Sequence, residues 1–390
     1  MLWTDRPEFA LYAEYFNAAQ GTYKIETRYF EEAARQLTLN DSEPPRYPDI
    51  VAGSWLKSAA TRSLFRPLDR LFKKEKLSRE SFYPPLLALG NIDGKQYLLP
   101  VAFNIPTLIF ARDTGELLSS PFTLGLPELK ALGKSYNVET NGVYSRMGFS
   151  PSWDDDFLFV SAVLAGASFR EASPLTWDND ALERSLAYVE SWIREANTDI
   201  QAEDDFSFKY FYDPPAKLVT SGRALFFYMP SSDLFTLSPE QGANLDFRWI
   251  AGENTIPISE DMVYYGIYRQ SRAQKAAEAF TLWFFREETQ RLFLENGKSK
   301  RLNETLFGIA NGFSALRTVT EQVFPQFYPS LLGHMPPHSF LSPPNILPRN
   351  WTAMKERVIL PYLHDRIRAA GRGDSLERRL SDWNRLNREL

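Results

Sequence analysis

The chain has 390 residues, 44% of them hydrophobic and 24% charged, which is enough for two globular domains with a sizeable core in each. A formal net charge of -5 argues against a nucleic-acid partner, and the absence of cysteine excludes disulfides, thiolate metal sites and a cysteine nucleophile. The longest mostly apolar run, residues 157–169, has 13 residues and is too short to cross a bilayer. Aromatic residues make up 14% of the chain, which indicates either a large aromatic core or aromatic surfaces that hold something flat.

The first hundred residues alternate between strand-like and helical segments. The spacing of Phe9, Tyr12, Ala13 and Phe16 predicts a helix over residues 7–19. Strands are predicted over residues 2–4, 23–27, 47–52, 96–103 and 107–110, with a turn at residues 91–95. Strands that alternate with helices favour an α/β fold with mainly parallel sheets.

The middle of the chain is richer in helices. Asp180 and Glu183 have the spacing of a capping box, which predicts a helix start. Four apolar residues continue this helix at helical spacing: Leu182, Leu186, Val189 and Ile193. Further along, the pattern predicts strands at residues 224–229 and 263–268, an amphipathic helix over 273–295, and a proline-dense structured loop over 325–348.

The common motifs of cofactor and catalytic sites are missing from the sequence. There is no glycine-rich phosphate loop, no dinucleotide fingerprint, no Gly-x-Ser-x-Gly elbow and no His-Glu-x-x-His helix. His334 and His338 are four apart, as zinc ligands on a helix would be, but Pro336 and Pro337 between them prevent a regular helical turn. We therefore expect no metal ion, no cofactor and no catalytic residue.

Residues 154–156 form the densest run of carboxylates next to apolar residues. Three interpretations stay open: a solvated helix N-terminus, where aspartate is favoured by the helix dipole, acceptors for ligand hydroxyls, or catalytic or metal-binding carboxylates. A second acidic run, residues 203–205, lies in a predicted polar loop and is expected to be solvated.

Six segments carry a resemblance to a known family. They are residues 3–17, residues 47–51 with 67–69, residues 93–102 with 108–110, residues 153–167, residues 221–224 and residues 276–290. In this order they resemble the extracellular solute-binding proteins of bacterial ABC importers, in the carbohydrate-binding cluster that includes maltose-binding proteins. The resemblance spans residues 1–300 and fades after residue 310, where Phe313, Phe324 and Tyr328 match no segment of the family.

This resemblance implies a two-lobed periplasmic-binding-protein fold of type II, in which each lobe has a mainly parallel sheet flanked by helices and a hinge joins the lobes. The first lobe would comprise residues 1–104 and 266–308, and the second residues 105–265 and 309–390. Such proteins are periplasmic or extracellular, often lipid-anchored through an N-terminal cysteine, and pass a solute to a membrane permease without changing it. We expect the same here, with the protein acting as a monomer. The lack of cysteine fits a sequence that begins after such an anchor.

The resemblance also implies which residues bind the solute. By their place in the matching segments they are Asp5, Arg6, Glu8, Ser54, Trp55, Asn104, Trp153, Asp154, Tyr228, Met229, Ser231, Tyr264 and, more loosely, Trp351. Flat aromatic side chains with a few acids and amides suit a pyranose ring, whose faces are apolar and whose rim is polar. Arg6 would also suit a phosphate or carboxylate, and each aromatic residue would equally suit a core.

The expected function is capture of a carbohydrate or polyol-type solute in a cleft between the lobes. The solute stays open at this point between a sugar, a glycerol-phosphate-type compound and another small polar molecule. Two alternatives come from other classes of function. One is a glycoside-processing hydrolase that uses the carboxylates of residues 154–156, and the other is a binding fold adapted to protein contact or sensing through residues 325–348.

Overall fold

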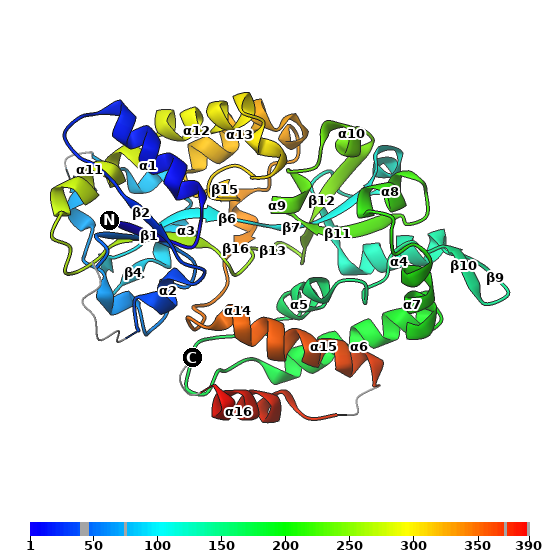
Figure 1. The fold of residues 1–390 in the computed structure, drawn as a ribbon. Helices are drawn as coiled ribbons and strands as arrows, with labels where there is room; N and C mark the ends of the chain where they lie inside the picture. The colour runs from blue at the N-terminus through cyan, green and yellow to red at the C-terminus, as the bar shows by residue number, and fades with distance from the viewer. Residues whose placement is uncertain (40–46, 74–75, 370–372, 388–390) are drawn as a thin grey trace.

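Two β-sheets form the centres of two lobes, which lie side by side in Figure 1. The computed structural model describes residues 1–39, 47–73, 76–369 and 373–387. Within these ranges the first sheet has the strand order β15 (Phe313–Ser314), β6 (Leu99–Phe103), β14 (Val263–Ile267), β3 (Ile50–Gly53), β1 (Leu2–Thr4) and β2 (Thr27–Tyr29). The second has the order β11 (Phe226–Pro230), β7 (Pro106–Ala111), β12 (Leu245–Ala251) and β8 (Thr123–Gly125).

The α/β expectation is confirmed, but both sheets are mixed rather than mainly parallel. In the first sheet β1 is parallel to β2 and β3, whereas β14 is antiparallel to β3 and β6. In the second, β7 is antiparallel to β11 and β12, and β12 is parallel to β8. Strands β7 and β14 each enter their sheet directly from the other lobe instead of through a crossover helix, so they are free to run antiparallel.

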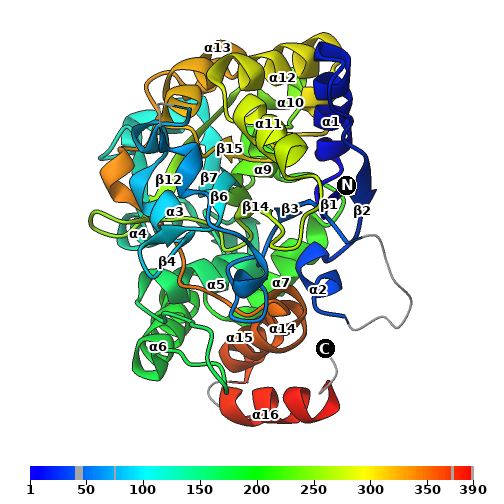
Figure 2. The ribbon, with the colours of Figure 1, turned by 90° about the vertical axis from the view of Figure 1, so that its left-hand side faces the viewer.

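The first lobe is covered by helices α1 (Glu8–Ala19), α2 (Ala33–Gln36), α3 (Pro84–Ala88), α11 (Gln274–Phe284) and α12 (Glu287–Ser299) (Figure 2). The predicted face of α1 is buried, with Phe9 stacked on Phe284 and Tyr12 on Phe293. The single helix predicted over 273–295 is broken at residues 285–286. Phe284 and Phe285, neighbours in sequence on either side of the end of α11, are both buried in the core.

The second lobe contains α4 (Leu126–Tyr136), α5 (Asp155–Leu164), α6 (Asn179–Ala196), α7 (Ile200–Lys209), α8 (Pro215–Thr220), α9 (Ser231–Leu234) and α10 (Pro239–Gly242). The predicted apolar stripe of α6 is buried. Its N-cap is Asp178, whose side chain accepts the N–H of Ala181 at 2.8 Å, so the cap predicted at Asp180 is two residues late.

The C-terminal part of the chain joins the second lobe beneath α5 (Figure 1). This part contains α14 (Trp351–Met354), α15 (Leu360–Arg368) and α16 (Leu376–Leu386), whereas α13 (Phe324–Phe327) lies beside α12 of the first lobe (Figure 1). A wide π-helical turn over Lys355–Ile359 connects α14 to α15 without a break. Pro361 follows it, and because proline has no N–H and its ring clashes with the preceding turn, a widened turn accommodates it.

The chain passes between the lobes three times, twice through short segments and once through the longer stretch between β15 and α14. Asn104 and Ile105 link β6 to β7, and residues 258–262 link β13 (Ile256–Pro257) to β14. The Ser259 N–H donates to the Asn104 carbonyl at 2.9 Å, which ties the two crossings together. Strand β16 (Leu341–Ser342) pairs with β13 and extends this region. The expected hinge between the lobes is therefore a pair of hydrogen-bonded crossings.

An aromatic cluster connects elements of both sheets. Phe313 of β15 packs against Trp249 of β12, with ring centroids 5.9 Å apart, and Phe235 stacks on Phe307 at 4.8 Å. Phe324 and Tyr328 complete the cluster from the region that matched no family segment. Most of the aromatic excess thus belongs to the core.

Three smaller findings complete the comparison with expectation. The strand predicted at 23–27 lies at Thr27–Tyr29, and the turn at 91–95 is a hairpin of β4 (Asn91–Ile92) and β5 (Lys95–Gln96). A second hairpin, β9 (Val138–Thr140) with β10 (Val143–Arg146), projects from the second lobe. No helix in the described ranges has both the length and the apolar character needed to span a bilayer.

Candidate functional site

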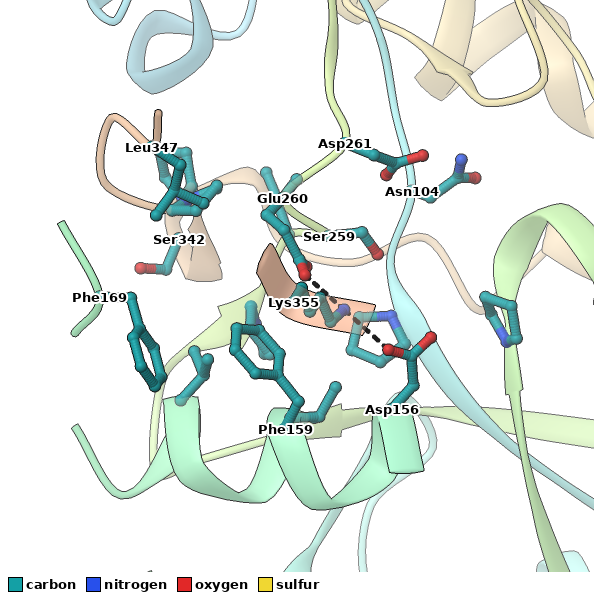
Figure 3. A pocket seen from close by; sticks show the side chains of 18 of the residues that line it. Asn104, Asp156, Phe159, Phe169, Ser259, Glu260, Asp261, Ser342, Leu347 and Lys355 are labelled. Carbon is teal, nitrogen blue, oxygen red and sulfur yellow. Dashed lines mark ion pairs between the residues drawn. The ribbon is translucent and has the colours of Figure 1, made fainter. Parts of the chain in front are cut away.

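A cavity of about 850 Å³ lies between the lobes, within the size range of small-molecule sites (Figure 3). Its walls come from the loop after β3, the two crossings, α5 with the residues that follow it, and the segment that leads from β16 into α15. The cavity therefore sits where loops of the first lobe face helices of the second.

Five aromatic side chains line the cavity: Trp55, Phe159, Phe169, Tyr228 and Trp351. Phe159 projects from α5 toward the interior in Figure 3. Trp351 packs on Phe159 and Phe169, with ring centroids 6.0 and 5.7 Å apart, and its indole N–H lies 3.4 Å from a Glu260 carboxylate oxygen. Trp351 is fully buried behind Phe159 and Phe169, so the flat apolar surfaces that can meet a ring face belong to Trp55, Phe159 and Phe169.

Trp55 is the aromatic wall contributed by the first lobe. Its backbone has φ 63°, in the left-handed region that costs energy for a non-glycine residue. The preceding turn is fixed by Asp5, which accepts the Ser54 N–H at 3.0 Å and packs so closely on Gly53 that a Cβ there would lie 2.5 Å from the carboxylate. The Trp55 indole N–H then donates to Thr352 of α14 at 3.1 Å, a direct contact between the lobes.

A buried lysine organises the polar side of the cavity. The Lys355 ammonium pairs with Asp156 of α5 at 2.7 Å and with Glu260 of the second crossing, as the dashed lines in Figure 3 show. It also lies 4.4 Å from the centre of the Phe159 ring. Burial lowers the pKa of Lys355, but the two carboxylates outweigh this effect and raise it overall, so the side chain stays charged.

A second charged group lies at the first-lobe end of the cavity. The Arg6 guanidinium donates to Ser54 Oγ at 2.8 Å and to the carbonyl of Asp261 at 3.1 Å. Asp5 is close by, 3.7 Å from Arg6, and burial raises the pKa of Asp5 to about 6 although Arg6 and the Ser54 N–H oppose this. This network links the loop after β3 to the second crossing.

The first crossing is held by one amide. Asn104 accepts a hydrogen bond from Ser231 Oγ at 2.8 Å and donates to the Asn311 carbonyl at 2.9 Å. The same Ser231 hydroxyl accepts the Ile105 N–H at 3.1 Å. Asn104 thus faces the cavity while its own position is fixed from both lobes.

The structure brings four of the residues implied by the resemblance into the cavity wall: Trp55, Asn104, Tyr228 and Trp351. Arg6 and Ser54 support the wall through their contacts with Asp261, and Asp5 supports Ser54. Ser231 supports Asn104. None of these four supporting residues lines the cavity itself.

The remaining five lie away from the cavity, each for a packing reason. Glu8 is buried in the first turn of α1, and the Met229 carbonyl accepts the Thr107 hydroxyl within the second sheet. Tyr264 is fully buried in the first lobe and donates to the Leu86 carbonyl at 2.8 Å. Trp153 stacks on Phe206 and Phe227, and Asp154 is the N-cap of α5.

Within each of the two acidic runs, neighbouring residues have different surroundings, which the sequence did not show. Asp154 accepts the N–H of Asp156 at 2.8 Å as a helix cap, which agrees with the helix N-terminus interpretation, while Asp156 two residues later faces the cavity. The expectation that residues 203–205 are all solvated is wrong. Glu203 is fully buried in α7 and accepts hydrogen bonds from Ser150, Ser152 and Asn197.

Sequence reasoning missed much of the cavity wall. It left Asp156 open as a ligand acceptor within the run 154–156, but it did not single out Phe159, Phe169, Glu260, Asn345 or Lys355. Asp156 and Phe159 are one helical turn apart, a spacing that could have placed them on the same face of α5 as soon as Asp154 was taken as the cap. Lys355 and Asn345 carry no sequence signal, because their segment lies beyond the family resemblance.

The comparisons with known proteins agree with this geometry. The family model for bacterial extracellular solute-binding proteins matches residues 12–299. Comparison with curated protein sequences gives no significant match.

Solved structures with the same fold cover nearly the whole chain. A sugar transporter from Rhizobium etli in an open conformation has a TM-score of 0.66 and 14% identity, covering 98% of this chain and 97% of its own. The cyclic α-maltosyl-1,6-maltose binding protein of Arthrobacter globiformis has a TM-score of 0.62 and 18% identity, covering 97% and 95%. The maltose/maltodextrin-binding domain of Bdellovibrio bacteriovorus, bound to maltotriose, has a TM-score of 0.57 and 16% identity, covering 98% and 96%.

At these identities the structural likeness shows the two-lobed fold, while the family model identifies the relatives by sequence. Two lobes, two hydrogen-bonded crossings and a cavity between them are what a protein needs in order to enclose a small solute. The chain belongs to the bacterial extracellular solute-binding protein family and is therefore a periplasmic or extracellular protein.

Proposed function

We propose that the protein captures a carbohydrate in the cavity between its lobes and delivers it to the membrane subunits of an ABC importer. The observation that carries this proposal is the lining of the cavity, in which Trp55, Phe159, Phe169 and Trp351 stand beside amide, hydroxyl and carboxylate groups. Sugars present apolar ring faces and a polar rim, and this combination suits both. The sugar-binding neighbours from Arthrobacter and Bdellovibrio support the same class of solute.

Release to a permease requires the lobes to open and close, and we propose lobe boundaries adjusted to the sheets. The first lobe would comprise residues 1–104 and 263–327, because β14 and β15 are part of its sheet and residues 319–327 pack on α12. Contacts that hold the lobes together here include Trp55 to Thr352, the Ala59 N–H to Glu171 at 2.7 Å, and Arg349 to the Thr38 hydroxyl. Solute that touches both lobes would favour this arrangement over an open one.

We infer that the solute is not chemically changed. The hydrolase alternative needs two carboxyl groups free to act on one bond. In the described structure Asp154 is engaged as a helix cap, and Asp156 and Glu260 share the ammonium of Lys355. Both comparison proteins named for sugars are binding proteins, which supports the same inference.

The test is a thermal-shift screen with neutral mono- and oligosaccharides, sugar phosphates, amino acids and polyamines, followed by calorimetry and chromatography of the recovered ligand. A ligand at a thousand times its Kd stabilises the protein by ~4 kcal/mol, which corresponds to several degrees in Tm. We expect shifts with sugars and unchanged sugar afterwards. Shifts with amino acids or polyamines alone, or a sugar product, would overturn the proposal.

Two tryptophan variants sharpen the test. Trp55→Ala removes a cavity wall and should weaken sugar binding at least tenfold, or ~1.4 kcal/mol. Trp153→Ala is the matched control, because Trp153 is stacked between Phe206 and Phe227 away from the cavity. Equal losses in both variants would show that Trp55 acts through the fold rather than through the solute.

A further inference from the structure

The charges around the cavity are strongly one-sided. Five carboxylates line it, against one ammonium group: Asp156, Glu253, Glu260, Asp261 and Glu356 against Lys355. Outside the wall, Arg6 contacts Asp261 and Asp5 is next to Arg6, while Arg170 contacts the wall residue Asn345 and Glu171 accepts the Ala59 N–H. These four residues add two charges of each sign, so the formal excess of four negative charges remains.

The one ammonium group in the wall is already committed. Lys355 has three N–H donors, and its ammonium faces Asp156 and Glu260 and also lies over the Phe159 ring. A phosphate or carboxylate on a solute would have to displace one of these carboxylates and would meet the other four. The cavity is therefore poorly suited to an anionic solute such as a sugar phosphate, which the sequence had left open.

The Asp156 carboxylate can accept further hydrogen bonds. One of its oxygens pairs with Lys355, yet about half of the side chain is exposed, and Figure 3 shows it directed into the cavity. A carboxylate has room for about four hydrogen bonds across its two oxygens. Because Lys355 is shared with the well-buried Glu260, the pair of carboxylates keeps one net negative charge, and the exposed part of Asp156 presents it to the cavity. Such a setting favours a cation, by charge and by charge-assisted hydrogen bonds.

We infer that the solute is a sugar that carries a positive charge, an amino sugar with a free ammonium group, and that Asp156 binds this group. The inference rests on the proposed function, since it specifies the class of sugar that the same cavity takes. Glu253 and Glu356 at the exposed rim add to the field that attracts the cation and repels sugar acids.

Calorimetry with matched pairs of sugars tests the inference. Each pair consists of a neutral sugar and its 2-amino-2-deoxy form with the same linkages: glucose, mannose and galactose, and the β-1,4-linked glucose trisaccharide. N-acetylated and uronic-acid forms complete each set, at pH about 6 so that the amine carries its proton. We expect the amino form of at least one pair to bind about tenfold more tightly than its neutral and acetylated forms, and the preference to shrink as salt is raised.

Charge variants show whether Asp156 is the group responsible. In Asp156→Asn the affinity ratio of amino to neutral sugar should fall from about tenfold to about twofold. Asp155→Asn is the matched control, because Asp155 is on the same helix turn and does not line the cavity, so its ratio should stay at the wild-type value. Glu356→Gln changes an exposed residue at the rim, so the fold should be unaffected. We expect it to lower the affinity ratio of amino to neutral sugar by less than Asp156→Asn does.

The outcomes separate this inference from the proposed function. Neutral, acetylated or acidic sugars that bind as tightly as the amino forms would overturn the cationic class and leave sugar capture standing. A ratio that stays unchanged in Asp156→Asn would overturn the role of Asp156. Binding of no sugar of any charge would overturn the proposed function and this inference with it.

Discussion

Lys57 offers a quantitative test of the packing around the cavity loop. It lies two residues after Trp55, is 6% exposed, and places its ammonium 4.5 Å from the centre of the Tyr264 ring. No carboxylate within the described ranges is at ion-pair distance from it. Burial therefore lowers the pKa of Lys57 from 10.5 to about 7.

The sign of the pH effect follows from proton binding. Between pH 7 and 10.5 the unfolded chain keeps the proton on Lys57 while the folded protein releases it, so stability rises with pH across this window. At ~1.4 kcal/mol per pKa unit the ceiling of the gain is ~5 kcal/mol, and relaxation around the charge will reduce it. Below pH 7 Lys57 is protonated in both the folded and the unfolded state, so the free-energy cost of burying its charge no longer changes with pH.

Lys57→Met keeps the length of the side chain and removes its charge. We expect it to raise the free energy of unfolding by ~2 kcal/mol or more at pH about 7, with the advantage fading toward pH about 10. Urea titrations of both proteins across this range measure the difference directly. Lys95→Met, at an exposed lysine of β5, controls for the loss of a surface charge. Parallel stability curves for the wild type and Lys57→Met would refute the reasoning.

Three further predictions follow from other parts of the fold. Phe313→Ala empties the middle of the aromatic cluster that joins the lobes and should cost ~3–5 kcal/mol in urea unfolding, whereas a loss below ~1 kcal/mol would mean that the cluster is loosely packed. Burial would raise the pKa of Asp246, but hydrogen bonds from His334, Phe247 and Arg248 lower it to about 2, so stability of ~1–2 kcal/mol should be lost as pH falls from 4 toward 2. In Asp246→Asn the free energy of unfolding should fall less between pH 4 and pH 2. An unchanged fall would show that the Asp246 carboxylate is not responsible for it. Glu171→Ala breaks the contact with the Ala59 N–H across the cavity mouth and should weaken solute binding about threefold through faster dissociation, which stopped-flow release would detect.

The spacing of apolar residues was sufficient to predict the helices that bury one face and expose the other. The face of α1 and the stripe of α6 lie where the spacing of their apolar residues predicts. The break between α11 and α12 at residues 285–286 could not be predicted from the sequence. Two adjacent phenylalanines also fit one continuous amphipathic helix, and the break becomes visible only in the packed core. The strand direction in each sheet depends on the order in which the chain visits the lobes, and alternation of side chains does not contain that order.

The candidate site was predictable only in part for a related reason. Trp55 and Asn104 follow strands that end at the cavity. Their position after a predicted strand was therefore enough to place them near the site. Trp153 and Asp154 lie at an equally suggestive helix entry, but one is taken up by Phe206 and Phe227 and the other by the N–H groups of α5. Lys355 reaches the cavity from about two hundred residues further along, and contacts at that separation leave no trace in a single sequence.

The most direct test of the central claim is a crystal structure of the protein with the sugar that gives the largest thermal shift. The sugar should lie between the lobes, with a ring face against Trp55, Phe159 or Phe169 and polar groups on Asp156 and Asn104. Sugar bound elsewhere, for example along residues 325–340, with this cavity filled by solvent alone, would contradict the assignment of the cavity as the solute site.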